Sequence, residues 1–476
     1  SEADLKLADL KVSNVDLLEL WGGPVGFLAG VEYREESFSD DRDPRLDGTV
    51  VFTDWQGDTF PFVSDVVSSS PTLDSDGSRD VFSVFTEFAM PLHRTLDVQL
   101  ALRYENFSDA GSTTVPKIAF GWRPIDWFML RGSWSEAVRA PNLVTLNERV
   151  VARSGNYEDW VCQYVRDVTG DPIDVLDSNC RYGWQRRALG NENLEPEKSD
   201  NYSIGMVVTP LQSLTATIDF WKIRKKDTIG LFGQDNLTLL DLLRRVENGL
   251  VGCESFVGLA ALERQPVDED AVPLFLEAGL CPAGEVSFGN EKYANLDTRT
   301  VEGFDFGVYY ETTSGVGEWS FKWVGSVYTR YVQTPGDLAG TISEAQEAGV
   351  IPSNYPINGL GDLLRKDGNQ ERKMNARARW WKGNWGASLS WYYLSEFYQS
   401  RLTLADGTRY VIPSHAYWNA SADYYFDFGK TETRIRLGIN NLTDERAPLA
   451  DKYFGFVSDA HRDYGRSYYF DIRMSF

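Results

Sequence analysis

The sequence lacks any apolar run of about 18 residues, the length that a transmembrane helix needs, so helical membrane spans are excluded. Basic residues are outnumbered, 47 against 70 acidic ones, and the net charge of −23 argues against a nucleic-acid partner, because phosphate binding needs a basic surface. Histidine is scarce: His93, His415 and His461 are scattered and predict no metal site. The start of the chain has no signal peptide, so we expect either a mature protein or one that begins within a longer polypeptide.

Catalytic motifs are also missing. We find no Gly-x-Ser-x-Gly elbow, phosphate-binding loop or His-Glu-x-x-His helix. Acidic runs such as Asp268-Glu269-Asp270 are better explained as solvated loop residues than as catalytic or calcium sites. The sequence therefore predicts a protein that is not an enzyme and that needs no cofactor.

Aromatic residues are abundant. They make up 13% of the chain, with 15 Trp, 23 Tyr and 26 Phe, yet the mean hydropathy is −0.35. A chain that is rich in Trp and Tyr but polar on average indicates many half-buried strands rather than one large apolar core.

Alternation of apolar and polar residues is the dominant pattern, and it places successive side chains on opposite faces of a strand. It is clearest at 96–105, 374–380, 385–393 and 434–440. The first of these segments has an apolar set of Leu96, Val98, Leu100, Leu102 and Tyr104. The whole sequence predicts an all-β chain of about 15 strands, each near the length of a tilted barrel strand.

Two all-β architectures fit this alternation, a soluble sandwich and a membrane barrel. Connection lengths distinguish them. Short links such as Gly383–Asn384, Gly429–Lys430 and Gln212–Ser213 alternate with long segments, roughly at 39–79, 144–198, 230–298 and 335–370. Compact soluble domains rarely repeat long connections, whereas outer-membrane barrels combine short periplasmic turns with long extracellular loops. We therefore predict a transmembrane antiparallel β-barrel.

The end of the chain forms one more alternating strand. Its apolar positions carry aromatic rings, which sit best at a membrane interface. The terminal Phe476 resembles the signal read by the outer-membrane assembly machinery, which we expect as a partner. The apolar set is Tyr468, Phe470, Ile472, Met474 and Phe476.

One long loop should contain a short helix after Ile229, which Asp235 or Asn236 could cap. Its apolar stripe is expected to pack the loop on itself. The stripe consists of Leu239, Leu242, Leu243 and Val246.

The four cysteines fall in two local pairs without the spacing of a zinc site. An even number, paired within single polar segments, predicts the disulfides Cys162–Cys180 and Cys253–Cys281 and an oxidising compartment. The second disulfide should staple the helical loop rather than contact ligand.

Four segments, in order along the chain, resemble segments of TonB-dependent receptors. They are the hairpin Gly23-Pro24-Val25-Gly26 followed by 30–34, the "FRAPN" strand end at 136–143 with Val138 in place of Phe, the "GNPxLxPE" entry at 190–199, and the "NLTD" segment at 438–444. Each is weak alone, but the ordered set spans nearly the whole chain. We identify the chain as resembling the C-terminal part of such a barrel.

The resemblance implies a 22-stranded barrel, with an N-terminal plug in its lumen, in the bacterial outer membrane. About 15 strands leave about seven strands and the plug to a separate N-terminal part of the receptor, and Ser1 is expected in an extracellular loop. The resemblance also implies import of a bulky nutrient with energy from the TonB complex, contact with lipid and lipopolysaccharide, and a possible surface lipoprotein partner. A passive porin or a barrel enzyme remains the alternative.

Ligand binding is expected at the extracellular loops, where aromatic rings and arginines are densest. Aromatic faces stack on sugar rings or flat chelates, and arginine supplies directed donors. Packing of the same rings within the loop is an equal alternative. The candidates are Tyr157, Trp160, Tyr164, Tyr182, Trp184, Arg181 and Arg186, with Trp55 as a second, separate position.

Inward-facing strand arginines are expected to contact the plug or to line the wall rather than to bind ligand. They are Arg103, Arg377, Arg379, Arg434 and Arg436. The ligand class stays open between a glycan or oligosaccharide and a ferric siderophore, although negatively charged loops would repel an anionic chelate. A peptide or cobalamin remains possible.

Overall fold

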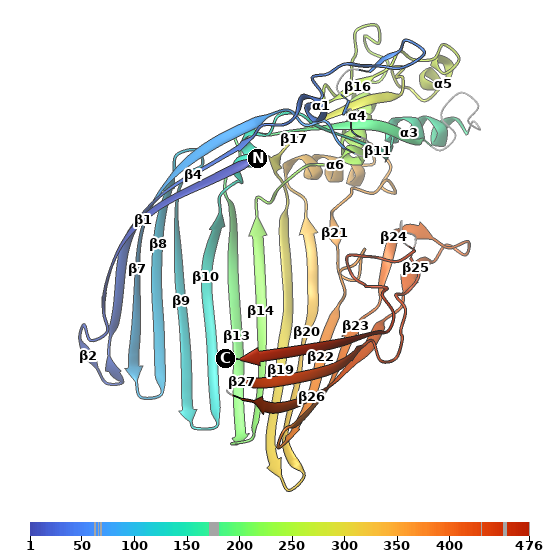
Figure 1. Cartoon of the computed structure of the whole chain (residues 1–476). Coiled ribbons are helices and arrows are strands. Elements are labelled where there is room, and N and C mark those ends of the chain that lie inside the picture. The colour runs from blue at the N-terminus through green and yellow to red at the C-terminus, as the bar shows by residue number, and fades with distance from the viewer. Residues whose placement is uncertain are drawn as a thin grey trace.

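A computed structural model describes residues 1–60, 63–64, 66, 69–170, 180–429, 431–450 and 455–475. Its main feature is one curved antiparallel sheet in which 15 strands follow one another in chain order (Figure 1). The predicted all-β architecture and the number of strands are confirmed.

We call these 15 strands the wall. A short strand, β21 (Gly361–Asp362), adds to β20. The wall strands are β1 (Glu2–Asn14), β4 (Gly26–Asp40), β7 (Ser75–His93), β8 (Leu96–Phe107), β9 (Gly111–Ile125), β10 (Phe128–Arg139), β13 (Glu197–Leu211), β14 (Leu214–Lys226), β19 (Thr298–Ser314), β20 (Gly317–Thr334), β22 (Arg372–Lys382), β23 (Trp385–Leu394), β26 (His415–Phe428), β27 (Thr431–Asn440) and β28 (Ser467–Ser475).

Connections at the two ends of the wall differ in length, as predicted. At one end the strands are joined by tight turns, such as 212–213, 315–316 and 383–384, and by the small β2–β3 hairpin (Glu19–Leu20, Gly23–Pro24). At the other end lie the long loops (Figure 1). Two long connections that the sequence analysis did not single out also lie at this end: 395–414 and the described residues 441–450 and 455–466.

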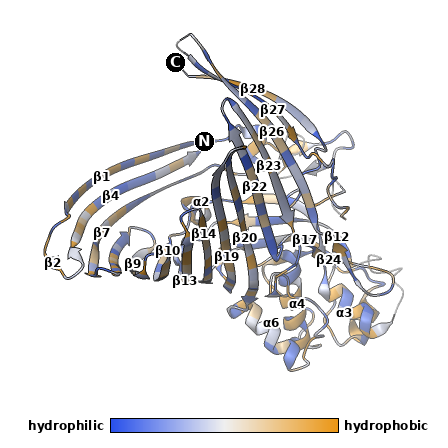
Figure 2. Ribbon diagram, turned by 90° about the horizontal axis from the view of Figure 1, so that it is seen from below, coloured by the Kyte–Doolittle hydropathy of each residue, from blue (hydrophilic) through white to orange (hydrophobic). Residues whose placement is uncertain are grey.

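The two faces of the wall carry different side chains. In the register of β4, β7 and β8, Val31 lies opposite Val84, and Val84 opposite Tyr104, so exposed apolar side chains line one face. The other face is polar: Arg103 forms ion pairs with Glu32 and Glu105. The hydropathy colours alternate along the strands accordingly (Figure 2).

Within the described part of the chain, β1 pairs only with β4, and β28 only with β27. The wall is therefore curved but open, with two free edges (Figure 2). In the same part of the chain, no helix is both long and apolar enough to cross a membrane.

The long loops, described at 143–170, 180–189, 229–296 and 337–360, fold together into a structure that we call the cap (Figure 1). A four-stranded sheet of order β11-β12-β17-β16, in which β12 and β17 are parallel, forms its frame. The elements are α2 (Leu143–Asn147), β11 (Val151–Glu158), α3 (Trp160–Thr169), β12 (Arg181–Leu189), β15 (Ile229–Gly230), α4 (Gln234–Asn248), β16 (Leu262–Arg264), α5 (Val272–Glu277), β17 (Val286–Lys292), β18 (Ala294–Asn295) and α6 (Asp337–Glu347).

The largest hydrophobic core of the molecule lies in the cap rather than in the wall. Side chains from α3, α4, α5 and α6 pack there against the cap sheet. Two smaller loop structures complete the fold. One contains α1 (Pro44–Asp47) with the β5–β6 hairpin (Phe52–Thr53, Thr59–Phe60), and the other is the β24–β25 hairpin (Phe397–Thr403, Arg409–Ile412).

The helix predicted after Ile229 is α4, and Leu239, Leu242 and Leu243 are buried in the cap core. The predicted N-cap is wrong. The residue at the N-cap position of the helix is Gly233, with φ of 98°, because the two candidate side chains have other hydrogen-bond partners. Asp235 Oδ1 accepts a hydrogen bond from the Glu158 backbone N–H, and Asn236 Nδ2 donates to the Phe232 carbonyl.

Candidate functional site

Three of the aromatic residues expected to bind ligand, Tyr157, Tyr182 and Trp184, lie on one face of the cap sheet. Tyr157 of β11 lies directly opposite Tyr182 of β12 in the register. The ring of Trp184 lies 5.0 Å from each of these two rings, centroid to centroid. Trp184 is only 4% exposed, and its Nε1 donates to Gln234 Oε1 of α4 at 3.1 Å. This geometry gives Trp184 a packing role in the cap core.

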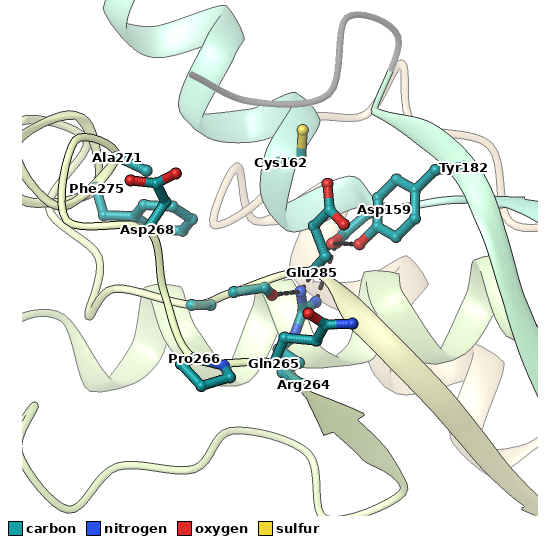
Figure 3. A pocket seen from close by; sticks show the side chains of 12 residues that line it. Asp159, Cys162, Tyr182, Arg264, Gln265, Pro266, Asp268, Ala271, Phe275 and Glu285 are labelled. Carbon is teal, nitrogen blue, oxygen red and sulfur yellow. Dashed lines mark hydrogen bonds and ion pairs between the residues drawn. The ribbon is translucent and has the colours of Figure 1, made fainter. Parts of the chain in front are cut away.

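A buried ion-pair network lies beside these rings (Figure 3). Asp159 is 2% exposed and accepts hydrogen bonds from Arg264 Nη1 at 2.7 Å, from Arg264 Nη2 at 3.0 Å and from the Tyr182 hydroxyl at 2.7 Å. Arg264 also contacts Asp241, which pairs with Arg245. Burial alone would raise the pKa of Asp159, but Arg264 and these hydrogen bonds outweigh burial and lower it. The network therefore stays ionised.

The network forms one side of a cavity of about 360 Å³. Pro266 and Phe275 add apolar walls, and the carboxylates of Asp268 and Glu285 belong to exposed residues (Figure 3). Because Asp159 and Arg264 are already saturated by each other and by their neighbours, the polar floor of the cavity is structural.

Trp160 and Tyr164 join the core through α3. The Trp160 ring stacks on Tyr355 at 4.6 Å, and the Tyr355 hydroxyl donates to Asp167 Oδ2 at 2.7 Å. Tyr164 packs against the core while partly buried. Tyr355 was missed by the sequence analysis because it lies in a non-periodic segment almost 200 residues further along the chain.

Two arginines of the cap sheet are differently placed. Arg153 of β11 lies directly opposite Arg186 of β12. Within the described residues, neither guanidinium has an acidic side chain in ion-pair range, and the buried Nε of Arg186 has no hydrogen-bond partner. Both act electrostatically on Tyr157 and Tyr293, whose pKa values burial raises. Arg153 also acts electrostatically on the Glu148 carboxyl, and Arg186 on that of Glu291, so the pair is a cationic position with carboxylates nearby but not in direct contact.

The other candidate residues lie apart from this pair. Arg181 is exposed, donates to the Asn156 carbonyl at 3.0 Å and lies 3.7 Å from Glu158. Trp55, 91% exposed, lies at the tip of the β5–β6 hairpin, in a different loop. Phe476 lies outside the described residues.

Both predicted disulfides are confirmed. Cys162 of α3 is bonded to Cys180, the residue directly before β12, and Cys253 is bonded to Cys281. Each closes one loop of the cap. In the described residues no group of three or more His, Cys, Asp or Glu side chains is arranged to hold a metal ion.

Arginines on the polar face of the wall line a cavity of about 470 Å³ between β22 and β28. Arg436 Nε donates to Asp423 Oδ1 at 2.6 Å, and Arg377 Nε donates to the Ser390 hydroxyl at 3.0 Å. Arg379 and Arg434 complete the set. Next to it lies a groove of about 530 Å³ with Tyr309, Tyr392 and Tyr417 among its lining residues. The sequence analysis did not single out these tyrosines.

The segments that suggested a family resemblance have definite structural roles. Arg139, in the "FRAPN" segment, pairs at 3.0 Å with Glu197, in the "PE" of the next segment. Asn142 caps α2 by accepting a hydrogen bond from the Val144 N–H. Asn441 has φ of 53°, and its side-chain oxygen accepts from the Glu445 N–H at 2.9 Å. The segments join strand ends to loops.

The sequence of the chain also matches a known protein family. Residues 4–442 match the family model described as "TonB dependent receptor-like, beta-barrel". The chain belongs to this family. Its members are transport receptors of the outer membrane.

Several individual receptors are similar. The probable TonB-dependent siderophore receptor PirA of Acinetobacter baumannii is 27% identical over 172 residues, 33% of this chain and 20% of that protein. The crystal structure of that receptor has a TM-score of 0.57 at 15% identity, covering 99% of this chain and 55% of its own. The ferric enterobactin receptor PfeA of Pseudomonas aeruginosa has a TM-score of 0.60 at 14% identity, with 99% and 54% covered. The chain thus spans about half the length of these solved receptors.

Proposed function

We propose that this chain is the C-terminal barrel part of an outer-membrane receptor that binds a bulky nutrient at its extracellular side and imports it with TonB-derived energy. Family membership supports the transport role and implies a plug domain and contact with TonB. The polar face of the wall then lines the lumen, and its apolar face contacts lipid and lipopolysaccharide.

The two open edges of the wall support the proposal that a second part of the same receptor completes the barrel. Each unpaired backbone group at β1 or β28 would cost several kcal/mol in lipid. An N-terminal part with the plug and about seven strands would close the barrel. A tag on this chain should therefore isolate, from outer membranes, either a longer polypeptide or a tightly bound N-terminal partner. Isolation of this chain alone as a stable monomer in lipid would contradict the proposal.

The Arg153–Arg186 pair favours an anionic ligand, and with the relatives' names it points to a ferric siderophore. Two guanidiniums that make no direct ion pair within the described residues, next to the Tyr157 ring, can donate to a chelate whose flat groups stack on aromatic faces. This pair carries the ligand proposal, because an anion needs cationic groups to offset the loop acids, which would repel it.

Binding of ferric enterobactin to the complete receptor tests this. The double change Arg153→Gln and Arg186→Gln should weaken binding about 10-fold to 100-fold, as expected for loss of charged hydrogen bonds worth about 1.5–3 kcal/mol. The matched change Arg181→Gln should leave binding nearly unaltered. Equal binding by all three proteins would remove the pair from the ligand site.

A glycan is the second candidate, favoured by the tyrosine groove on the polar face. The Tyr392 and Tyr417 rings lie 5.1 Å apart and nearly parallel, and Asn375 and Asp305 line the same groove. Such rings and polar groups suit a sugar chain. A maltooligosaccharide is a suitable probe. A glycan ligand would be favoured if the receptor binds this probe but not ferric enterobactin, and if Tyr392→Ala abolishes the binding.

A further inference from the structure

Two of the three histidines, far apart in sequence, meet at the outer end of the wall. His415 is the first residue of β26, and His461 lies in the loop between β27 and β28. Their rings lie 5.4 Å apart with an interplanar angle of 85°. The Phe397 ring of the β24–β25 hairpin stacks on His461 at 5.7 Å.

The environment of His461 is apolar, and none of the described residues offers its ring a polar partner. The residue is 3% exposed, and within the described residues neither ring nitrogen has a hydrogen-bond partner. Around it lies a small core of Phe397, Ile412 and Val457. A buried polar group without a partner normally costs about 1–3 kcal/mol, so this arrangement is unusual for a purely structural residue.

Charges near the pair come from three elements. Glu445 and Asp463, in the same loop as His461, act on His415, and Asp463 is itself paired with Arg446 at 2.7 Å. On the hairpin, Arg409 stacks over Tyr398 at 4.5 Å instead of facing the histidines. Along β26, Tyr417 contacts His415 at 5.6 Å and feels the charge of Arg462. Among the described residues, the charge that acts on His461 is that of His415, which disfavours its protonation.

Burial, and then the neighbouring His415, lower the pKa of His461 to about 4 from its ordinary value of 6.5. The neutral ring is therefore the form that fits the closed packing. Once the segments separate and water reaches the ring, His461 regains its ordinary proton affinity. The closed state is fully stable above about pH 6.5 and loses stability as the pH falls from there towards 4.

The position of the two histidines links this pH dependence to the tyrosine groove. His415 lies on the polar face of β26, opposite Leu394 in the register, and Leu394 and Tyr417 both line the tyrosine groove. The hairpin and the histidine loop are further joined by the Tyr410 hydroxyl, which donates to the Leu449 carbonyl at 3.0 Å. The two segments therefore meet at the outer end of that groove.

We propose that His415 and His461 form an acid-sensitive latch that holds the β24–β25 hairpin against the 455–463 segment and releases both when the pH falls. The effect on transport rests on the proposed function, since release would widen the way into the groove. The release itself does not depend on any ligand.

Hydrogen–deuterium exchange of the complete, ligand-free receptor in detergent tests the latch at pH 7.5 and 5.5, after correction for intrinsic exchange rates. Between these values the opening equilibrium of the two segments should rise about 10-fold, given pKa values of about 4 closed and 6.5 open. His461→Phe should abolish this rise, because phenylalanine fills the apolar site and cannot titrate. The control His93→Phe, at the opposite end of the wall, should retain it.

The proposal is wrong if the wild-type segments exchange equally at both pH values, or if the rise persists in His461→Phe. Should that variant not fold, carbon-13 histidine spectra of the wild-type receptor decide the matter. A His461 signal that titrates near pH 6.5 in the folded protein would also overturn the latch. Because no ligand is present, failure here is distinct from failure of the transport proposal.

Discussion

The wall and the cap are built on opposite principles. The wall is one layer of strands whose buried contacts are mainly backbone hydrogen bonds, and its apolar side chains, such as Leu100 and Leu102, are exposed. The cap is a two-layer structure with an apolar core, two disulfides and a buried ion-pair network. A wall of this kind depends on its lipid and lumen environment, whereas the cap carries its own stability. Substitutions should therefore act in opposite ways in the two regions.

The largest effect is expected from breaking the cap network. Arg264→Met leaves Asp159 and Asp241 buried without their shared cation, which should destabilise the cap by about 3–5 kcal/mol. Amide exchange of cap segments should accelerate while that of the wall strands stays unchanged. Arg181→Met is the matched control, since the exposed ion pair of Arg181 with Glu158, at 3.7 Å, should contribute less than about 1 kcal/mol. Equal loss of protection in wall and cap would mean that the two regions are not separable.

The wall should respond to which face a charge occupies. Leu100→Arg puts a cation on the apolar face of β8 and should cost about 2–4 kcal/mol in a bilayer. Gln99→Arg, one residue away on the polar face next to Glu87, should be nearly neutral. Urea unfolding of the complete receptor in lipid vesicles measures the difference. Equal costs for the two variants would contradict the assignment of the faces.

The same contrast explains what the sequence could predict. Alternation is a local signal, so the strands, the two faces, the tight turns and four of the long loops were predictable, whereas the connections at 395–414 and 441–466 were missed. The disulfides were also predictable, because their cysteines are neighbours within single loops. These features require no knowledge of contacts between distant segments.

The cap interior required such knowledge. Arg264 meets Asp159 across 105 residues, and the amide of Asn358 meets Asp235 across 123. The parallel pairing of β12 with β17 has no local pattern either. For the same reason the sequence analysis treated His415 and His461 as scattered, although they are in contact. Most of the candidate rings lie near one another in the cap, but which of them pack and which stay accessible depends on these long-range contacts.

The smallest effect should come from the junction between the two regions. Arg139 is largely exposed, whereas its partner Glu197 is 2% exposed and keeps Lys225 at 2.8 Å and the Ile229 N–H at 2.8 Å. Arg139→Met should therefore lower stability by less than about 1 kcal/mol, because Glu197 remains paired and water screens the lost contact. Glu197→Met removes the partner of both the Lys225 ammonium and the Ile229 N–H, and it should therefore lower stability by more than Arg139→Met. Urea unfolding midpoints of the two variants measure the difference. A loss above about 2 kcal/mol in Arg139→Met would contradict this prediction, because the ion pair that the exposed Arg139 makes with Glu197 would then contribute far more stability than the exposure of Arg139 allows.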